Sequence, residues 1–153
     1  MINEKLAELG ITIPEAPTPL AAYVPGQVVG NFLYTSGQVA LQNGTLAYKG
    51  RVGADLTEEE GIAAARICAL NCLGVAKKYL GDLERIEQIV KITVFVNSIE
   101  GYGNQPKVAN GASELLVQIF GEKGKHARSA VGVSGLPLDS PVEIEMIALI
   151  KEQ

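Results

Sequence analysis

The chain has few of the residues that build disulfide frameworks, metal sites and histidine-dependent catalytic sites. Among 153 residues there are two cysteines and one histidine. Cys68 and Cys72 stand four residues apart in a segment that we expect to be helical, where disulfide geometry is poor, so we predict reduced core thiols. With His126 as the single imidazole, a metal site is not predicted. His126 has no second titrating partner in the sequence, so we interpret it as surface or interface polarity rather than a catalytic base.

The chain also lacks an excess of basic residues and a long apolar run. It carries 13 Lys and Arg against 17 Asp and Glu, a formal net charge of −4, without a local Lys or Arg cluster. Because attraction to phosphates supplies most non-specific nucleic-acid binding, a nucleic-acid partner is not expected. No basic segment leads into an apolar stretch at the N-terminus, so we predict no signal peptide, no membrane partner and a cytoplasmic location.

What the sequence does contain is enough apolar material for one folded domain. Apolar residues make up 47% and charged residues 20% of the chain, which are ordinary values for a globular protein. At this length a core closes without disulfides or metal. We find no repeat or interdomain linker, and therefore predict one domain over residues 1–153, in which residues 1–20 form an N-terminal extension that begins with a short helix.

Two long helices are marked by the residues at their ends. Thr57 and Glu60 have the spacing of a capping box, apolar residues then recur at three- and four-residue intervals, and Gly81 follows the last of them. A second helix is predicted over residues 106–120, which ends at Gly121.

Segments rich in β-forming residues surround these helices. Residues 21–41 read as consecutive strands of a meander, residues 86–96 as a central strand, and residues 128–133 and 142–150 as two more. This order suits one mixed sheet with both helices on one face. The last strand is apolar on both sides, so the second face of the sheet needs a cover, which another subunit would supply.

Arg128 begins one of the apolar strands, where a guanidinium needs an anionic partner. Its planar fork suits bidentate recognition of a carboxylate, and the alternative is a structural salt bridge to Glu143 or Glu145. The two glutamates point to the same side of the final strand. They are either an acid/base pair, with one pKa raised by shielding, or a solvated or ion-paired strand face. Residue patterns leave both alternatives open.

Several segments, taken in order, resemble the Rid (YjgF/L-PSP endoribonuclease-like) superfamily. They are residues 23–26, 30–38, 90–96, 127–131, 136–137 and 142–148. The resemblance spans nearly all of the chain from residue 23 to residue 150. It implies an α/β (α+β), chorismate-mutase-like fold, with a single mixed β-sheet and two helices packed on one face. It also implies a homotrimer with ligand clefts between subunits.

The same resemblance implies roles for particular residues. Arg128 would grip a substrate carboxylate and Glu143 would position water, so these two are the predicted catalytic residues. The predicted ligand-binding residues are Tyr23, Ser36, Gly37, Asn110 and Ala130. The family reaction is hydrolysis of 2-imino acids, formed from enamines such as 2-aminoacrylate, to 2-keto acids and ammonia, without metal or cofactor. The ligand would be a small carboxylate metabolite.

Two positions differ from the best-known members of the superfamily. Ala130 stands where those members often have cysteine, and His126 where they often have proline. A distinct subgroup is indicated by the N-terminal extension, the longer loop over residues 42–55, and the segments 71–72 and 126–128. A non-catalytic trimeric binder of small carboxylates, or a regulator, is therefore the alternative function. A third candidate is an endoribonuclease, but the acidic charge balance and the lack of a His/Lys catalytic set argue against it.

Overall fold

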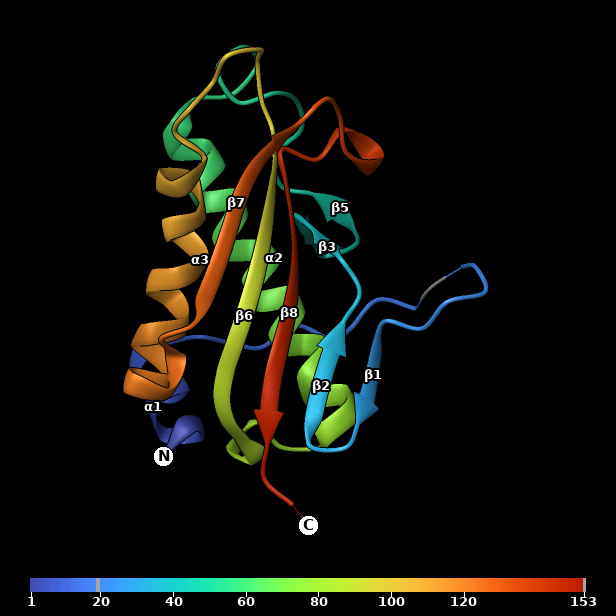
Figure 1. Ribbon diagram of the computed structural model, residues 1–153, viewed down its shortest axis with the longest axis vertical. Helices are drawn as coiled ribbons and strands as arrows, with labels where there is room; N and C mark the ends of the chain where they lie inside the picture. The colour runs from blue at the N-terminus through green and yellow to red at the C-terminus, as the bar shows by residue number, and fades with distance from the viewer. Residues whose placement is uncertain (19, 153) are drawn as a thin grey trace.

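The computed structural model describes residues 1–18 and 20–152 (Figure 1). Its helices are α1 (Ile2–Leu9), α2 (Glu58–Leu80) and α3 (Gln105–Phe120), with short 3-10 turns at Leu83–Arg85, Gly121–Gly124 and Pro137–Asp139. Its strands are β1 (Gly26–Val29), β2 (Phe32–Thr35), β3 (Gln38–Val39), β4 (Leu41–Gln42), β5 (Thr45–Leu46), β6 (Ile86–Asn97), β7 (Ala127–Val133) and β8 (Val142–Ile150). The main sheet has the order β1-β2-β8-β6-β7, with β3 also paired to β8, and α2 ends just before Gly81, as predicted.

The two long helices form as their end signals predict, and in Figure 1 α2 lies behind the sheet while α3 stands beside it, next to β7. The Thr57 hydroxyl accepts a hydrogen bond from the Glu60 N–H at 3.2 Å, and the Glu60 carboxylate accepts one from the Thr57 N–H at 3.0 Å. Gly81, with a φ of 82°, ends α2. The helices approach closely, because a Cβ at Gly111 would lie 2.1 Å from the Ile62 carbonyl oxygen. Backbone therefore contacts backbone where α2 and α3 meet.

The predicted meander is correct for β1 and β2 but wrong for the next strand. β1 and β2 form an antiparallel hairpin, whereas β3 pairs with β8, so β2 and β3 lie one after the other along the same edge of β8. Between them, at Ser36 and Gly37, the ladder is interrupted. There the Thr35 hydroxyl replaces a strand partner and accepts a hydrogen bond from the Met146 N–H at 3.0 Å.

The two cysteines are reduced and buried, as predicted, and they contact β8. The Cys68 thiol donates to the Val142 carbonyl at 3.4 Å and the Cys72 thiol to the Ile144 carbonyl at 3.3 Å. Burial raises the pKa of Cys72 to about 12, and it raises the pKa of Cys68 well above its usual value. Two weak donors from α2 thus hold the strand on either side of Glu143.

The sheet has one covered face and one open face. On β8 the residues that face the helices are buried, namely Val142, Ile144, Met146, Ala148 and Ile150. The side without helices, called here the open face, carries large apolar groups that include Phe32, Tyr34 and Val131, which are 39%, 43% and 44% exposed. Within the described residues no helix is long and apolar enough to cross a membrane.

The N-terminal extension lies against the outer side of the helices. α1 contacts α3 and ends at Gly10, which has the left-handed φ of 67° that favours glycine. The segment that follows crosses behind the helices in Figure 1, and a Cβ at Gly74 of α2 would lie 2.4 Å from the Pro14 carbonyl oxygen. The extension therefore covers α2 on the side away from the sheet.

Candidate functional site

Arg128 lies near the start of β7, the edge strand that runs beside α3. Its Nη1 donates to the Asn110 Oδ1 at 2.8 Å and to the Ser113 Oγ at 3.1 Å. Both acceptors come from α3, where the three-residue spacing of Asn110 and Ser113 puts them on one side of the helix. Two neutral acceptors from a single helix therefore fix one end of the guanidinium.

The other end of the guanidinium has no carboxylate partner among the described residues. The ion pairs there join Lys5 to Glu8, Lys107 to Glu58 and Lys125 to Glu122. A salt bridge from Arg128 to Glu143 or Glu145, the alternative role that the sequence allowed for Arg128, is not among these ion pairs. Since Nη1 has two hydrogens and two acceptors, the edge formed by Nε and Nη2 remains for an anion, and that edge has the geometry of bidentate carboxylate recognition.

His126 and Ser113 extend the hydrogen-bonded group around Arg128. The His126 Nε2 lies 2.9 Å from the Ser113 Oγ, and its Nδ1 lies 2.6 Å from the Gly124 carbonyl oxygen. A carbonyl only accepts, so Nδ1 carries the proton and Nε2 accepts from the serine hydroxyl in neutral histidine. Burial lowers the pKa of His126, the hydrogen bond to Gly124 partly opposes it, and the nearby charge of Arg128 adds to the lowering, so the neutral form is favoured.

Glu143 lies near the start of β8, close to the interruption between β2 and β3. A Cβ at Gly37 would lie 2.8 Å from its carboxyl carbon and 2.9 Å from its Oε2, so glycine leaves the space that this carboxylate occupies. Partial burial, and then repulsion from Glu145, raise the pKa of Glu143. The sequence left open whether one of the two glutamates is shielded, and the structure shows that Glu143 is.

Ser36 ties the segment before β1 to the same region. Its Oγ donates to the Val24 carbonyl at 2.7 Å, and its N–H donates to the Pro25 carbonyl at 2.8 Å. Tyr23 directly precedes this anchored pair and is 58% exposed. Ser36, Gly37 and Glu143 therefore lie in one neighbourhood, called here the glutamate half, and Tyr23 precedes the two residues that Ser36 anchors.

A second neighbourhood contains Arg128, Asn110 and Ala130 and is called here the arginine half. Ala130 follows Arg128 by two residues on β7, so it lies on the same side of the strand and contacts the core. The structure thus brings the predicted site residues together in two groups rather than one.

The two halves are separated within a single chain. Arg128 is in register with the buried Ile92 on the helix side of the sheet, whereas Glu143 is in register with Phe95 on the open face. Ile92 and Phe95 are three residues apart along β6, which corresponds to roughly 10 Å. One chain therefore does not place Arg128 and Glu143 around the same small ligand.

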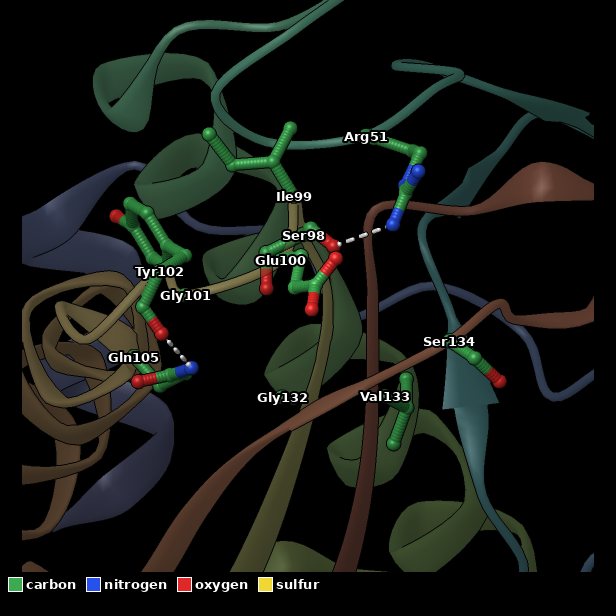
Figure 2. Close-up of a pocket in the computed structure, with 10 residues that line it drawn as sticks. All are labelled: Arg51, Ser98, Ile99, Glu100, Gly101, Tyr102, Gln105, Gly132, Val133 and Ser134. Carbon is green, nitrogen blue, oxygen red and sulfur yellow. Dashed lines mark hydrogen bonds between the residues drawn. The ribbon is translucent and has the colours of Figure 1, made fainter.

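A separate pocket of about 440 Å³ lies at the C-terminal ends of β6 and β7 (Figure 2). Arg51 donates from Nη2 to the Ser98 carbonyl at 2.9 Å, and Gln105 donates from Nε2 to the Tyr102 carbonyl at 2.6 Å. Its lining contains none of the residues that the sequence predicts for the site. The pocket lies at the opposite end of β7 from Arg128.

Metal ligands are not clustered in the part of the chain that the structure describes. Residues 1–18 and 20–152 hold no group of three or more His, Cys, Asp or Glu that could bind a metal ion. The titratable side chains near the two halves include Glu143, Glu145 and His126.

Sequence reasoning missed Ser113 and underestimated His126. His126 stands two residues before Arg128, the spacing at which side chains of a strand share a side, and Ser113 stands one helical turn after Asn110. These spacings were the available signals. They became informative only once α3 was known to lie beside β7.

The fold agrees with a comparison against known families. The chain belongs to the Rid/YjgF superfamily, because residues 3–150 match the family described as "YjgF/chorismate_mutase-like, putative endoribonuclease". The predicted chorismate-mutase-like fold is thereby confirmed.

Individual relatives cover almost the whole chain. Protein TCP17 of Trypanosoma cruzi is 44% identical over 95% of this chain and 92% of its own. The crystal structure of Atu1372 from Agrobacterium tumefaciens, described as of unknown function, is 42% identical, with a TM-score of 0.91 over 98% of this chain and 92% of its own. A protein of Dermatophagoides farinae named 2-iminobutanoate/2-iminopropanoate deaminase is 28% identical over 92% of this chain and 95% of its own.

Proposed function

We propose that the protein binds a small carboxylate metabolite and hydrolyses 2-imino acids to 2-keto acids and ammonia, in a cleft completed by a second copy of the chain. The observation that carries this proposal is the Arg128 guanidinium, held at Nη1 by two neutral acceptors and without a carboxylate partner among the described residues. Membership of the superfamily, and the name of the relative from Dermatophagoides farinae, support the reaction type.

The need for a second copy follows from the separation of the two halves. Arg128 and Glu143 lie on opposite sides of the sheet, so a cleft that uses both needs the arginine half of one chain and the glutamate half of another. The apolar groups of the open face supply a surface for that contact, since exposed patches of this kind mark interfaces. A closed ring of three copies, the predicted homotrimer, would repeat the cleft at each contact.

The chemistry needs one anchor and one proton carrier. Arg128 would hold the carboxylate and so place C2 of the imine beside Glu143 of the other copy. The Glu143 carboxylate would accept a proton from water as the water oxygen bonds to C2, and would return that proton to the nitrogen. The C=N π bond opens onto nitrogen in this step, which gives a carbinolamine. Glu143 would then accept the hydroxyl proton and pass it to the amino nitrogen, so that the C–N bond breaks as the C=O bond forms and ammonia leaves. The raised pKa of Glu143 suits this use as both base and acid.

The reaction is tested with 2-aminoacrylate generated by an auxiliary enzyme, which tautomerises to 2-iminopropanoate and yields pyruvate on hydrolysis. We expect pyruvate to form faster with the protein than in buffer. Glu143→Gln should lower kcat by about 10²- to 10⁴-fold, the usual contribution of general acid–base catalysis. Arg128→Lys keeps the charge but loses the fork, and should raise KM by roughly 10- to 100-fold.

A non-catalytic binder of the same carboxylates is the second candidate, because the arginine half alone supplies a carboxylate site. It predicts that pyruvate binds in calorimetry and that binding is lost in Arg128→Ala, without any acceleration of hydrolysis. If the native protein accelerates hydrolysis, and the Arg128→Ala and Glu143→Gln variants accelerate it equally, the proposed cleft is contradicted under either function.

A further inference from the structure

We infer that Ser113 and His126 are positioning residues that orient Arg128 for carboxylate binding. This inference rests on the proposed carboxylate site and adds two residues to it. Both lie outside the set that the superfamily resemblance implies, and neither needs to touch the ligand. Their effect would pass through the Arg128 guanidinium.

The hydrogen bonds form a chain with one consistent direction. The Arg128 Nη1 donates to the Ser113 Oγ at 3.1 Å, the Ser113 hydroxyl donates to the His126 Nε2 at 2.9 Å, and the His126 Nδ1 donates to the Gly124 carbonyl at 2.6 Å. Every step pairs one donor with one acceptor. Because the Ser113 hydroxyl donates its proton to His126, its oxygen can accept the hydrogen bond from Arg128.

The far end of this chain is fixed by backbone packing. Gly124 is buried, and a Cβ there would lie 2.3 Å from the Leu116 carbonyl oxygen of α3. The Gly121–Gly124 turn is thus pressed against the helix that also carries Ser113. The Gly124 carbonyl is consequently a rigid anchor, and the imidazole transmits that rigidity to the serine hydroxyl.

The consequence for Arg128 is a defined direction of its free edge. With Asn110 and Ser113 both bound to Nη1, rotation of the guanidinium would break two hydrogen bonds. The Nε and Nη2 hydrogens are therefore held in place before a ligand arrives. Preorganisation of this kind improves binding because less side-chain freedom is lost when the carboxylate docks.

The charged groups around His126 do not offer a competing role as an ion-pair partner. The charged side chain that acts on the pKa of His126 is Arg128, and its positive charge lowers that pKa. On the adjoining turn, the Lys125 Nζ is paired with the Glu122 Oε1 at 2.8 Å, and both side chains are mainly exposed. The imidazole is thus neutral in the arrangement described and serves as an acceptor for Ser113.

Nuclear magnetic resonance can read this chain of hydrogen bonds directly, because His126 is the single histidine of the protein. In ¹⁵N-labelled full-length protein at pH 7.5 we expect the Nδ1–H tautomer, with the Nε2 shift moved by an accepted hydrogen bond. Ser113→Ala should remove that displacement. An Nε2–H tautomer, or an Nε2 shift unaffected by Ser113→Ala, would overturn the inference.

Binding of pyruvate, measured by calorimetry, then tests the effect on Arg128. Ser113→Ala and His126→Phe should each weaken binding by about tenfold, the effect of losing one hydrogen bond to a charged group. His126→Gln, which keeps an acceptor toward Ser113, should recover most of the loss. Ser134→Ala, at the opposite end of β7 and exposed, is the matched control and should bind as the native protein does.

The outcomes separate this inference from the proposed hydrolysis. If native protein binds pyruvate, and Ser113→Ala weakens that binding, the positioning role stands even if no 2-aminoacrylate is hydrolysed. If both Ser113→Ala and His126→Phe bind pyruvate unchanged, the role is wrong whatever the turnover. If native protein fails to bind pyruvate at all, carboxylate recognition by Arg128 is contradicted and the positioning role falls with it.

Discussion

Arg128 and Glu143 project from opposite faces of the same sheet. Arg128 is in register with the buried Ile92 and contacts α3, whereas Glu143 is in register with Phe95 on the open face. Because side chains alternate along a strand, a register different by one residue would put the two on one side. The strand register therefore decides whether one chain or two chains can form a cleft with both residues.

Glycine at position 37 is predicted to be required for the Glu143 carboxylate to keep its place. In Gly37→Ala the added Cβ would meet the carboxyl carbon at 2.8 Å, so the carboxylate must move. Since displacement of a catalytic group by about 1 Å costs up to about 10²-fold in rate, we expect kcat for 2-aminoacrylate hydrolysis to fall by roughly 10- to 100-fold. The Tm should change little, because a flexible side chain can yield.

Gly135→Ala is the matched control for that substitution. A Cβ at Gly135 would meet nothing within 4 Å. Kinetics and thermal unfolding of both variants check the prediction. Native kcat in Gly37→Ala would contradict the placement of Glu143.

Removal of the charge at Glu143 is predicted to stabilise the protein near neutral pH. Burial and Glu145 raise its pKa in the folded state, so the folded protein holds this proton more tightly than the unfolded chain. The stability from the protonated form is complete below the unfolded pKa, about 4.3, and is lost as the pH rises through the folded pKa. Glu143→Gln should therefore unfold at a higher temperature than native protein at pH 7.5.

The difference in Tm between Glu143→Gln and native protein should be smaller near pH 4 than at pH 7.5. Thermal unfolding at a fixed protein concentration measures it, with the exposed Glu100→Gln as control. A gain in Tm for Glu143→Gln that is equal at pH 4 and pH 7.5 would exclude charge burial as its cause.

Glu58 is predicted to have the opposite pH dependence. Hydrogen bonds from Tyr102, Asn104 and Lys107 lower its pKa to about 2, and the Tyr102 and Asn104 side chains reach its Oε2 at 2.5 and 3.0 Å. Stability from this carboxylate is present above the unfolded pKa and is lost as the pH falls through about 2. Glu58→Gln should lower the Tm by a few degrees at pH 7.

Glu59→Gln, on the same first turn but exposed, is the control for Glu58. The deficit of Glu58→Gln should narrow as the pH is lowered from 4.5 toward 2, which circular dichroism can follow. If the Tm of Glu58→Gln stays below that of native protein by the same amount over this pH range, the charge of the Glu58 carboxylate is not the cause of the difference.

The helices and most strands were predictable because their signals are local. The capping box of Thr57 and Glu60, and the glycine that follows each helix, depend only on neighbours in the chain. The pairing of β3 was not predictable in this way. The interruption between β2 and β3 at Ser36 and Gly37, after which both strands pair with the same edge of β8, involves a contact of Thr35 with Met146, more than a hundred residues away.

The candidate site was predictable in its members but not in its geometry. Arg128 and Glu143 were selected from the residues and the family resemblance, yet their opposite orientation follows from the pairing of β6 with both neighbours, Ile92 with Arg128 and Phe95 with Glu143. Ser113 gave no signal as a single serine on a helix. Its importance arises because α3 lies beside β7, which is a tertiary relationship.

Mixing two defective variants tests the shared cleft most directly. Arg128→Ala and Glu143→Gln are unfolded together in equal amounts, refolded, and assayed with 2-aminoacrylate, while native mass spectrometry measures mixed assembly. If each cleft takes Arg128 from one copy and Glu143 from another, about one cleft in four in randomly mixed assemblies contains both native residues. Activity should therefore recover to about a quarter of the native value. Mixed assemblies that remain as inactive as either variant alone would contradict the shared cleft.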